Sequence, residues 1–281
     1  MTEDGEAARG VWGVVPPRTA QATRTALVTG AGSGLGALAA QRLAAAGWDV
    51  VGVDVDEAGL GRTAARSPNM HTRICDVADP KAVEAVVAET GEPHRVVHAA
   101  GISPLGPALE QPLDEVERVI RINYLGTVHV VRATLPGMLA RGHGELILFS
   151  SLAGWLSVPL TSAYAAAKAA VNAYAETLVH EHGDSGVKIR CVCPAQVDTP
   201  MLRRIVARYP AVGRTRIMEP RLVLDEIDRS LARPARDLYV LPGGRAKAAV
   251  FVQRHAPRLL GLALRQAAGR AGGTPEAART A

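Results

Sequence analysis

The feature that most constrains the fold of this chain is a regular alternation of two kinds of segment. From residue 24 onward, short apolar runs rich in β-branched residues alternate with Ala- and Leu-rich stretches whose apolar residues recur at helical spacing. The runs predict strands at 26–29, 50–54, 70–75, 95–99, 145–150, 187–193 and 238–241, and the stretches predict helices near 35–46, 57–66, 79–90, 112–139, 163–183 and 219–233. This alternation is typical of an α/β fold with a parallel sheet, because parallel strands need crossover helices that cover both faces.

The same pattern predicts one structured domain between two different ends. No linker divides residues 24–244, which we expect to form a single domain. Residues 1–23 lack periodicity and contain Pro16 and Pro17, so we expect a mobile arm. Residues 245–281 predict a basic amphipathic extension, with a helix over 246–266 interrupted at Pro257. Since the chain has neither a long apolar run nor a signal-peptide pattern, we expect a cytoplasmic protein.

Charge and cysteine content narrow the classes of partner. Residues 1–199 hold 16 basic and 21 acidic side chains, whereas residues 200–281 hold 16 and 6. A basic C-terminal third can face an anionic membrane, nucleic acid or an acidic substrate, or form an arginine-rich solvated surface. It lacks the interleaved aromatic residues of nucleic-acid readers, so we expect no nucleic-acid partner. Three cysteines cannot form a disulfide framework; we expect all to be reduced, with strand geometry separating the side chains of Cys191 and Cys193.

A glycine-rich turn directly follows the first expected strand. In Thr29-Gly30-Ala31-Gly32-Ser33-Gly34-Leu35-Gly36, the glycines permit a tight turn and let backbone N–H groups approach a pyrophosphate at the positive end of the next helix. The turn indicates either a dinucleotide site or a tight turn without ligand. Asp54 ends the second strand, where a carboxylate accepts both ribose hydroxyls of adenosine, which favours NAD over NADP. Asp76, after the third strand, is placed to contact adenine, although each acid can also cap a strand end.

A second group of residues carries acid–base chemistry. Tyr164 and Lys168 stand four apart in an expected helix and therefore share one face. A phenol is a poor base at neutral pH, but a neighbouring ammonium and a nicotinamide cation both favour the phenolate, so we expect Lys168 to lower the pKa of Tyr164. Ser151 follows the fifth strand at its carboxyl end, where ligands gather in a parallel sheet. Its hydroxyl is placed to hold a substrate oxygen or, alternatively, to cap the following turn.

Together these residues resemble the short-chain dehydrogenase/reductase family. The Gly-x-x-x-Gly-x-Gly spacing of Gly30, Gly34 and Gly36 is similar to that family's turn, and Ser151, Tyr164 and Lys168 match its catalytic triad in order and spacing. Asn123, in Arg121-Ile122-Asn123-Tyr124-Leu125-Gly126, matches the asparagine that completes the family's tetrad. The resemblance spans residues 24–242 and implies a Rossmann-type, doubly wound domain with a seven-stranded sheet. It also implies an oxidoreductase that interconverts a secondary alcohol and a ketone with a nicotinamide cofactor.

By the same resemblance, the cofactor contacts several turns of the chain. The implied cofactor-binding residues are Gly30, Ser33, Gly34, Leu35, Gly36, Asp54, Asp76, Val77, Ala100, Gly101, Tyr164, Lys168, Pro194, Val197 and Thr199. Asn123 is implied to position a water through which Lys168 exchanges protons with solvent. Two departures from the family's pattern affect this set: His98-Ala99-Ala100-Gly101 stands where Asn-Asn-Ala-Gly is usual, and Pro194-Ala195 where Pro-Gly is usual. We expect His98 to be a packed strand residue.

The substrate pocket is expected near the ends of the fourth, fifth and sixth strands. Its candidate residues are Ser103, Trp155, Leu202 and Tyr209, and the segment 201–209 is apolar with a basic edge from Arg203, Arg204 and Arg208. This composition predicts a fairly large hydrophobic alcohol or ketone, such as a steroid, polyketide or lipid-derived compound; alternatively, Arg203 and Arg204 bind a carboxylate or phosphate. No metal site is expected, because His180 and His182 are two apart on a helix and point in different directions.

The sequence leaves alternatives open for the oligomeric state, for the position of the C-terminal extension and for whether the chain is an enzyme. Helices 112–139 and 163–183 are what relatives use for close helix packing, so we expect a homodimer or homotetramer. The C-terminal extension is expected to pack on the chain's own fold, with the active site, a neighbouring subunit or an anionic membrane surface as alternatives. The alternative to an enzyme is a non-catalytic dinucleotide-binding sensor or scaffold. That class predicts loss of Tyr164, Lys168 or Ser151, and all three are present.

Overall fold

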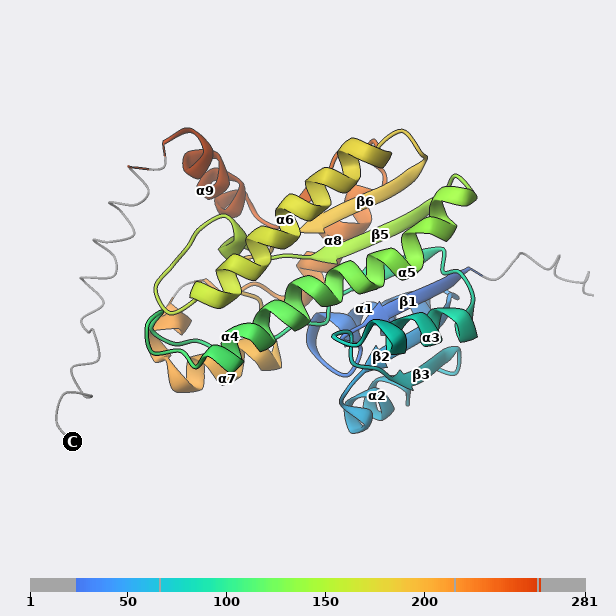
Figure 1. Ribbon diagram of the computed structural model, residues 1–281, viewed down its shortest axis with the longest axis horizontal. Coiled ribbons are helices and arrows are strands. Elements are labelled where there is room, and N and C mark those ends of the chain that lie inside the picture. The colour runs from blue at the N-terminus through green and yellow to red at the C-terminus, as the bar shows by residue number, and fades with distance from the viewer. Residues whose placement is uncertain (1–23, 66, 215, 257, 259–281) are drawn as a thin grey trace, which may run out of the picture.

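The computed structural model describes residues 24–65, 67–214, 216–256 and 258. Within these residues, seven parallel strands form one sheet in the order β3-β2-β1-β4-β5-β6-β7. Figure 1 shows helices in front of the sheet and behind it. The expected α/β fold, a doubly wound Rossmann-type domain with a seven-stranded sheet, is therefore confirmed.

Each strand coincides with one of the short apolar runs of the sequence. The strands are β1 (Thr25–Thr29), β2 (Asp49–Asp54), β3 (Met70–Ile74), β4 (Arg95–His98), β5 (Gly144–Phe149), β6 (Val187–Val192) and β7 (Tyr239–Val240). The α-helices are α1 (Gly34–Ala45), α2 (Glu57–Ala64), α3 (Pro80–Thr90), α4 (Leu113–Ile120), α5 (Gly126–Ala140), α6 (Ser162–His182), α7 (Pro200–Arg208), α8 (Pro220–Leu231) and α9 (Gly244–His255).

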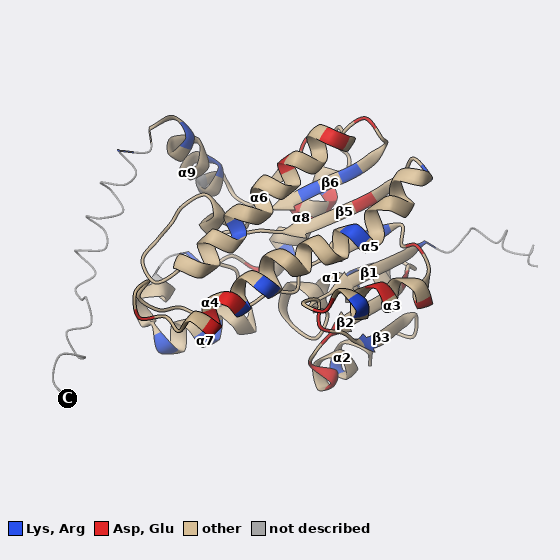
Figure 2. Ribbon diagram, in the orientation of Figure 1, with Lys and Arg blue, Asp and Glu red and all other residues tan. Residues whose placement is uncertain are grey.

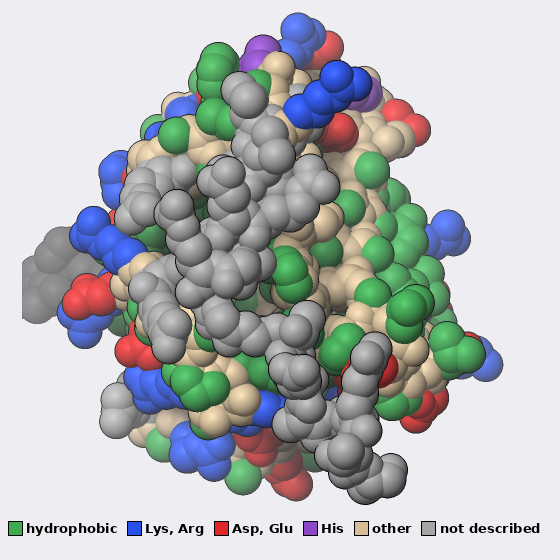
Figure 3. All heavy atoms as spheres, turned by 90° about the vertical axis from the view of Figure 1, so that its left-hand side faces the viewer, with side chains coloured by type: hydrophobic (Ala, Val, Ile, Leu, Met, Phe, Trp, Pro, Cys, Tyr) green, Lys and Arg blue, Asp and Glu red, His purple; other side chains and the backbone are tan. Residues whose placement is uncertain are grey.

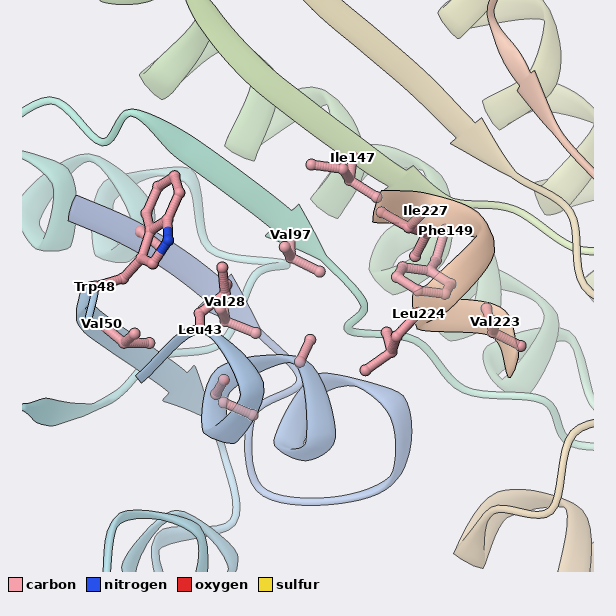
Figure 4. Close-up of a cluster of buried hydrophobic side chains, with 14 of the residues drawn as sticks. Val28, Leu43, Trp48, Val50, Val97, Ile147, Phe149, Val223, Leu224 and Ile227 are labelled. Atoms are coloured by element: carbon pink, nitrogen blue, oxygen red, sulfur yellow. The ribbon is translucent and has the colours of Figure 1, made fainter. Parts of the chain in front are cut away.

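Alternation along the strands divides the core into two layers. On one face, Val28, Val97 and Ile147 pack with side chains of α1, α2 and α8, as the close-up in Figure 4 shows for α1 and α8. On the other face, Leu27 and Val96 pack with α3, α5 and α6. Because neighbouring residues of a strand point to opposite faces, one apolar run fills both layers, which is why these strands read as continuous apolar runs.

The order of the strands locates the crevice in which a ligand binds. The chain leaves β1 for β2 on one side and later returns to β4 on the other, so β1 pairs with both. In open parallel sheets, ligands bind outside the carboxyl ends of the strands where the order reverses in this way. The residues that follow β1 and β4 therefore flank the expected site.

Two segments differ from the expected secondary structure. The stretch 112–139, expected as one helix, is α4 and α5 joined by a π-helical turn, η1 (Arg121–Leu125). The segment after β6, expected only as a pocket wall, forms α7. Of the expected C-terminal helix over 246–266, the described part is α9, and the rest lies outside the described residues, as does the expected arm 1–23. No described helix is long and apolar enough to span a membrane.

The expected separation of Cys191 and Cys193 is wrong. Both thiols lie near one acceptor, with their Sγ atoms 3.4 and 3.6 Å from Oδ1 of Asn172. Residues two apart in a strand point to the same face, so strand geometry brings these side chains together. All three cysteines are buried free thiols, as expected.

Candidate active site

The glycine turn after β1 adopts a conformation that only glycine satisfies at two positions. Gly30 has φ of 69°, and a Cβ added there would lie 2.8 Å from the backbone N of Ala100. A Cβ added to Gly36 would lie 2.2 Å from the carbonyl oxygen of Gly30. Backbone therefore packs directly on backbone: the turn lies against the segment that follows β4, and the start of α1 lies against the turn.

This turn, with the acid beside it, fits a dinucleotide. Ser33 is the N-cap residue of α1 and makes no side-chain capping bond, which leaves its hydroxyl for a ligand at the positive end of the helix. The Asp54 carboxylate accepts the N–H of Gly32 at 2.9 Å and the N–H of Asp56 at 3.0 Å, so it lies against the turn. A glycine cradle, a helix N-terminus and a neighbouring carboxylate are the groups that bind pyrophosphate and ribose.

Most of the other candidate cofactor residues follow three further strands, β3, β4 and β6. Asp76 accepts the N–H of Ala78 at 2.9 Å, and Val77 is buried. Thr199 is the N-cap residue of α7 and accepts the N–H of Leu202 at 3.3 Å. A Cβ on Gly34 would lie 3.6 Å from Thr199, so the start of α7 and the glycine turn are neighbours. The remaining residues line the same edge: Ala100 donates to Thr29, Gly101 faces Asn123, Pro194 accepts from Leu152, Val197 is buried, and Leu35 packs on the core.

The strand end of β5 and the first turns of α6 bring the three catalytic candidates together. Ser151 follows β5, and its Oγ accepts the N–H of Ala153 at 3.1 Å. The Ser151 side chain is a neighbour of Tyr164 and acts to lower the pKa of its phenol. The Nζ of Lys168 is buried, lies 5.7 Å from the centre of the Tyr164 ring and donates to the carbonyl oxygen of Phe149 at 2.8 Å. The expected shared face of Tyr164 and Lys168 therefore looks toward Ser151.

Burial sets the protonation of this group. Burial raises the pKa of Tyr164 above the usual phenol value, and the hydrogen bond from Ser151 acts in the opposite direction. Burial also lowers the pKa of Lys168 to about 8. The expectation that Lys168 lowers the pKa of Tyr164 is not what the protein alone shows, because the ammonium is directed at the Phe149 carbonyl and desolvation of the phenol dominates. Tyr164 is therefore protonated at neutral pH and poised to donate.

The π turn explains how Asn123 reaches this edge of the sheet. Its fully buried side chain donates from Nδ2 to the carbonyl oxygens of Ile102 at 2.9 Å and Val119 at 3.1 Å. A Cβ on Gly101 would lie 2.5 Å from Oδ1 of Asn123 and 3.6 Å from Nζ of Lys168. Glycine at 101 thus lets Asn123, Lys168 and the loop after β4 meet. π turns inside helices are frequent at functional sites.

His98 lies beneath the site, and sequence reasoning did not assign it contacts there. Its buried ring places Nδ1 2.8 Å from Oγ1 of Thr29, whose oxygen also accepts the N–H of Ala100 at 3.2 Å. Burial lowers the pKa of His98 to about 3, with the Lys168 charge adding to the effect. A neutral imidazole that holds the end of β1 against the end of β4 agrees with the expected packed strand residue.

The substrate candidates lie in three segments, which follow β4, β5 and β6. Leu202 is buried on α7, and the Tyr209 hydroxyl donates to the carbonyl oxygen of Leu105 at 3.0 Å, joining the end of α7 to the loop after β4, where Ser103 is half-buried. The Trp155 ring packs against Tyr239 with 4.9 Å between centroids. Figure 3, which looks onto this side of the molecule, shows hydrophobic side chains bordered by charged ones.

Two further observations concern an anionic substrate at α7 and the side chains that could hold a metal ion. The Arg203 guanidinium is paired with Asp198 at 2.7 and 3.0 Å, which satisfies the charge that a carboxylate or phosphate would require. In the described part of the chain, no three His, Cys, Asp or Glu side chains are grouped to hold a metal ion.

Comparisons with known proteins point to one family. The family model described as short chain dehydrogenase matches residues 24–210. The chain is 36% identical over 204 residues to 1-deoxy-11-beta-hydroxypentalenate dehydrogenase of Streptomyces avermitilis, covering 69% of this chain and 76% of that one. A short chain dehydrogenase/reductase of Burkholderia phymatum, solved in complex with NAD, is 27% identical with a TM-score of 0.75 over 84% of this chain and 95% of its own. An actinorhodin polyketide ketoreductase, solved with NADPH, is 27% identical with a TM-score of 0.72 over 79% and 97%.

Proposed function

Because this chain belongs to the short-chain dehydrogenase/reductase family, we propose that it interconverts a secondary alcohol and a ketone with NAD(H), using Tyr164 as the proton donor and acceptor. It is an oxidoreductase that acts on alcohol or ketone substrates. The observation that carries the proposal is that Ser151, Tyr164 and Lys168 lie together at the carboxyl end of β5, next to a glycine turn that fits a dinucleotide.

Each of these side chains has a separate part in the proton transfer. A bound nicotinamide supplies or accepts the hydride at the substrate carbon. In the reducing direction, the protonated phenol of Tyr164 donates its proton to the carbonyl oxygen, while the Ser151 hydroxyl holds that oxygen and stabilises its developing negative charge. In the oxidising direction, Tyr164 as phenolate takes the alcohol proton, and the positive charge of Lys168 and of the oxidised nicotinamide favours that phenolate.

Lys168 and Asn123 are proposed to relay protons between Tyr164 and solvent. Lys168 is buried with a pKa lowered to about 8, so it can gain or lose a proton near neutral pH. Asn123 holds the loop after β4 beside Lys168 and is proposed to position a water that leads to solvent. Lys168 is also proposed to bind the nicotinamide ribose.

Asp54 supports NAD as the preferred cofactor. Its carboxylate accepts two backbone N–H groups beside the glycine turn, where the adenosine ribose is expected. The ionised group repels a 2′-phosphate, and the next residue, Val55, is exposed and supplies no compensating cation.

The apolar character of α7 supports a fairly large hydrophobic substrate. Leu202 is buried on the side of α7 that faces the fold, whereas the charged end of Arg203 is already paired with Asp198. We propose Ser103, Leu202, Tyr209 and Trp155 as substrate-pocket residues. A homodimer or homotetramer is proposed as the working assembly, supported by the exposed apolar side chains of Leu113 and Leu125 near the ends of α4 and η1.

A paired assay tests this proposal. Secondary alcohols and ketones of increasing hydrophobic size are screened with NAD(H) and NADP(H) side by side, following absorbance of the reduced nicotinamide. We expect turnover that rises with apolar size and a kcat/KM for NAD at least about tenfold above that for NADP, equivalent to about 1.4 kcal/mol. Tight nicotinamide binding without turnover of any alcohol or ketone would instead indicate the non-catalytic sensor.

A further inference from the structure

The described C-terminal helix makes a specific contact with the loop that carries the catalytic serine. Figure 1 shows α9 on the same side of the molecule as α7 and the start of α6, and Figure 2 colours basic residues of α9 blue. The Arg254 guanidinium carbon lies 4.6 Å from the centre of the Trp155 ring and 5.9 Å from the centre of the Tyr239 ring. Ala246 and Val250 of α9 are buried, so the helix is seated on the fold at two further points.

An acid on α6 completes this contact. The Glu176 carboxylate accepts from Nη2 of Arg254 at 3.3 Å and from the Tyr239 hydroxyl at 2.8 Å. The Trp155 and Tyr239 rings meet edge to face, with 4.9 Å between their centroids. The indole is therefore held between β7, α6 and α9, and we call Arg254, Glu176, Tyr239 and Trp155 the tryptophan clamp.

Trp155 lies on the only covalent path between Ser151 and Tyr164. The one-turn 3₁₀ helix η2 (Leu152–Gly154) follows Ser151, and the N–H of Trp155 closes it by donating to the Leu152 carbonyl at 3.0 Å. Within the same turn, the Ser151 hydroxyl accepts the N–H of Ala153 at 3.1 Å. A shift of the indole is therefore transmitted through one short turn to the Ser151 hydroxyl, which lies beside Tyr164.

The rest of this path is held by bonds that do not involve Trp155. The carbonyl of Leu160, a residue with φ of 70°, accepts the N–H of Gly106 at 3.0 Å, and the Thr161 hydroxyl donates to the Val158 carbonyl at 2.7 Å. The clamp adds a constraint on Trp155 from outside the loop.

We propose that Arg254 is a positioning residue: through the tryptophan clamp, the C-terminal extension holds the Ser151 loop in the geometry that proton transfer requires. The inference rests on the proposed function for its kinetic consequence, but the contact and its effect on loop order do not depend on it. It also gives the extension a role within the chain's own fold, on residues that the structure describes.

Arg254 is suited to a clean experiment because its side chain is 52% exposed, so shortening it leaves no buried cavity. The test compares Arg254→Ala and Arg254→Lys with Lys247→Ala, a matched control that removes an exposed cation from the same helix without touching the clamp. The first measurement is hydrogen exchange of the full-length protein without substrate. Amides of 152–161 should exchange about fivefold or more faster in Arg254→Ala, and unchanged in Lys247→Ala.

The second measurement is kinetic. Arg254→Ala should lower kcat about tenfold with an unchanged Kd for NADH, because a small displacement of a catalytic group mainly affects the reacting step. Arg254→Lys, which keeps a cation over the ring, should retain about half of the activity. In a Ser151→Ala background, the additional effect of Arg254→Ala should fall below about twofold, because the group it positions is gone.

The outcomes separate this inference from the proposed function. Unchanged exchange of 152–161 in Arg254→Ala overturns the clamp, as does a kinetic loss of equal size with and without Ser151. If the wild type turns over no alcohol or ketone, the proposed function fails, and the exchange measurement alone decides the clamp.

Discussion

The two halves of the sheet build their parts of the site from different materials. On the side of β1, β2 and β4, the site is main chain: Gly30 and Gly36 allow backbone to contact backbone, and Asp54 is held by backbone N–H groups. On the side of β5 and β6, it is side chains, namely the buried Lys168 against the Phe149 carbonyl and the half-buried Tyr164 beside Ser151. The main-chain part depends on glycines that leave room for backbone contacts, whereas the side-chain part depends on burial that sets the pKa of its groups.

Substitution in the glycine turn, on the side of β1, β2 and β4, should have the largest effect on nucleotide binding. In Gly36→Ala, the new Cβ would lie 2.2 Å from the Gly30 carbonyl oxygen, so the turn must open and detectable NADH binding should be lost. The matched control is Gly61→Ala on α2, where an added Cβ meets nothing within 4 Å and should stabilise the fold by about 0.5–1 kcal/mol. Calorimetric titration with NADH and thermal unfolding measure both. Normal binding by Gly36→Ala would remove the backbone contact from the account.

In the half of the sheet that holds β5 and β6, the free energy of unfolding should be most sensitive to substitution where a charge is buried. Arg190 on β6 is fully buried and donates to the carbonyls of Ile189, Ser230, Arg233, Pro234 and Ala235, thereby capping the end of α8. Arg190→Met should lower the free energy of unfolding by about 3 kcal/mol, because buried carbonyls lose their donors. Arg229→Met, on the exposed face of α8, should cost less than about 1 kcal/mol. Urea titration compares the two, and equal effects would contradict this assignment.

A smaller, pH-dependent effect distinguishes Lys168 from an ordinary surface lysine. The folded pKa of about 8 lies below the unfolded value, so the unfolded chain binds more protons between about pH 8 and 10.5, and stability rises with pH through that window. Relative to Lys168→Met, the wild type should gain roughly 2–3 kcal/mol of unfolding free energy from pH 7 to 10.5. Lys247→Met should track the wild type. Parallel pH profiles for Lys168→Met and the wild type would show that burial does not depress this pKa.

The same contrast decides what could be predicted from the sequence. All seven strands overlap their predicted ranges, and the glycine turn lies where its spacing places it, because both are encoded in consecutive residues. The π turn at Asn123 was missed because its bonds reach Ile102, a contact that exists only after folding. The burial of Arg190 could not be predicted from its place in a strand, since most of its carbonyl partners lie about forty residues later in the chain. The pKa of Tyr164 in the protein alone could not be predicted from spacing, which reveals the neighbour Lys168 but not the burial that raises this pKa.

The central claim is that the Tyr164 hydroxyl transfers the proton in the reaction, and removing that hydroxyl tests it most directly. The decisive measurement is kcat for a substrate found in the paired screen, together with the Kd for NADH, in Tyr164→Phe and the wild type. If Tyr164 transfers the proton while the glycine turn and Lys168 still hold the nucleotide, kcat should fall by about two to four orders of magnitude with Kd within about twofold. A Phe variant that turns over at the wild-type rate would contradict the account.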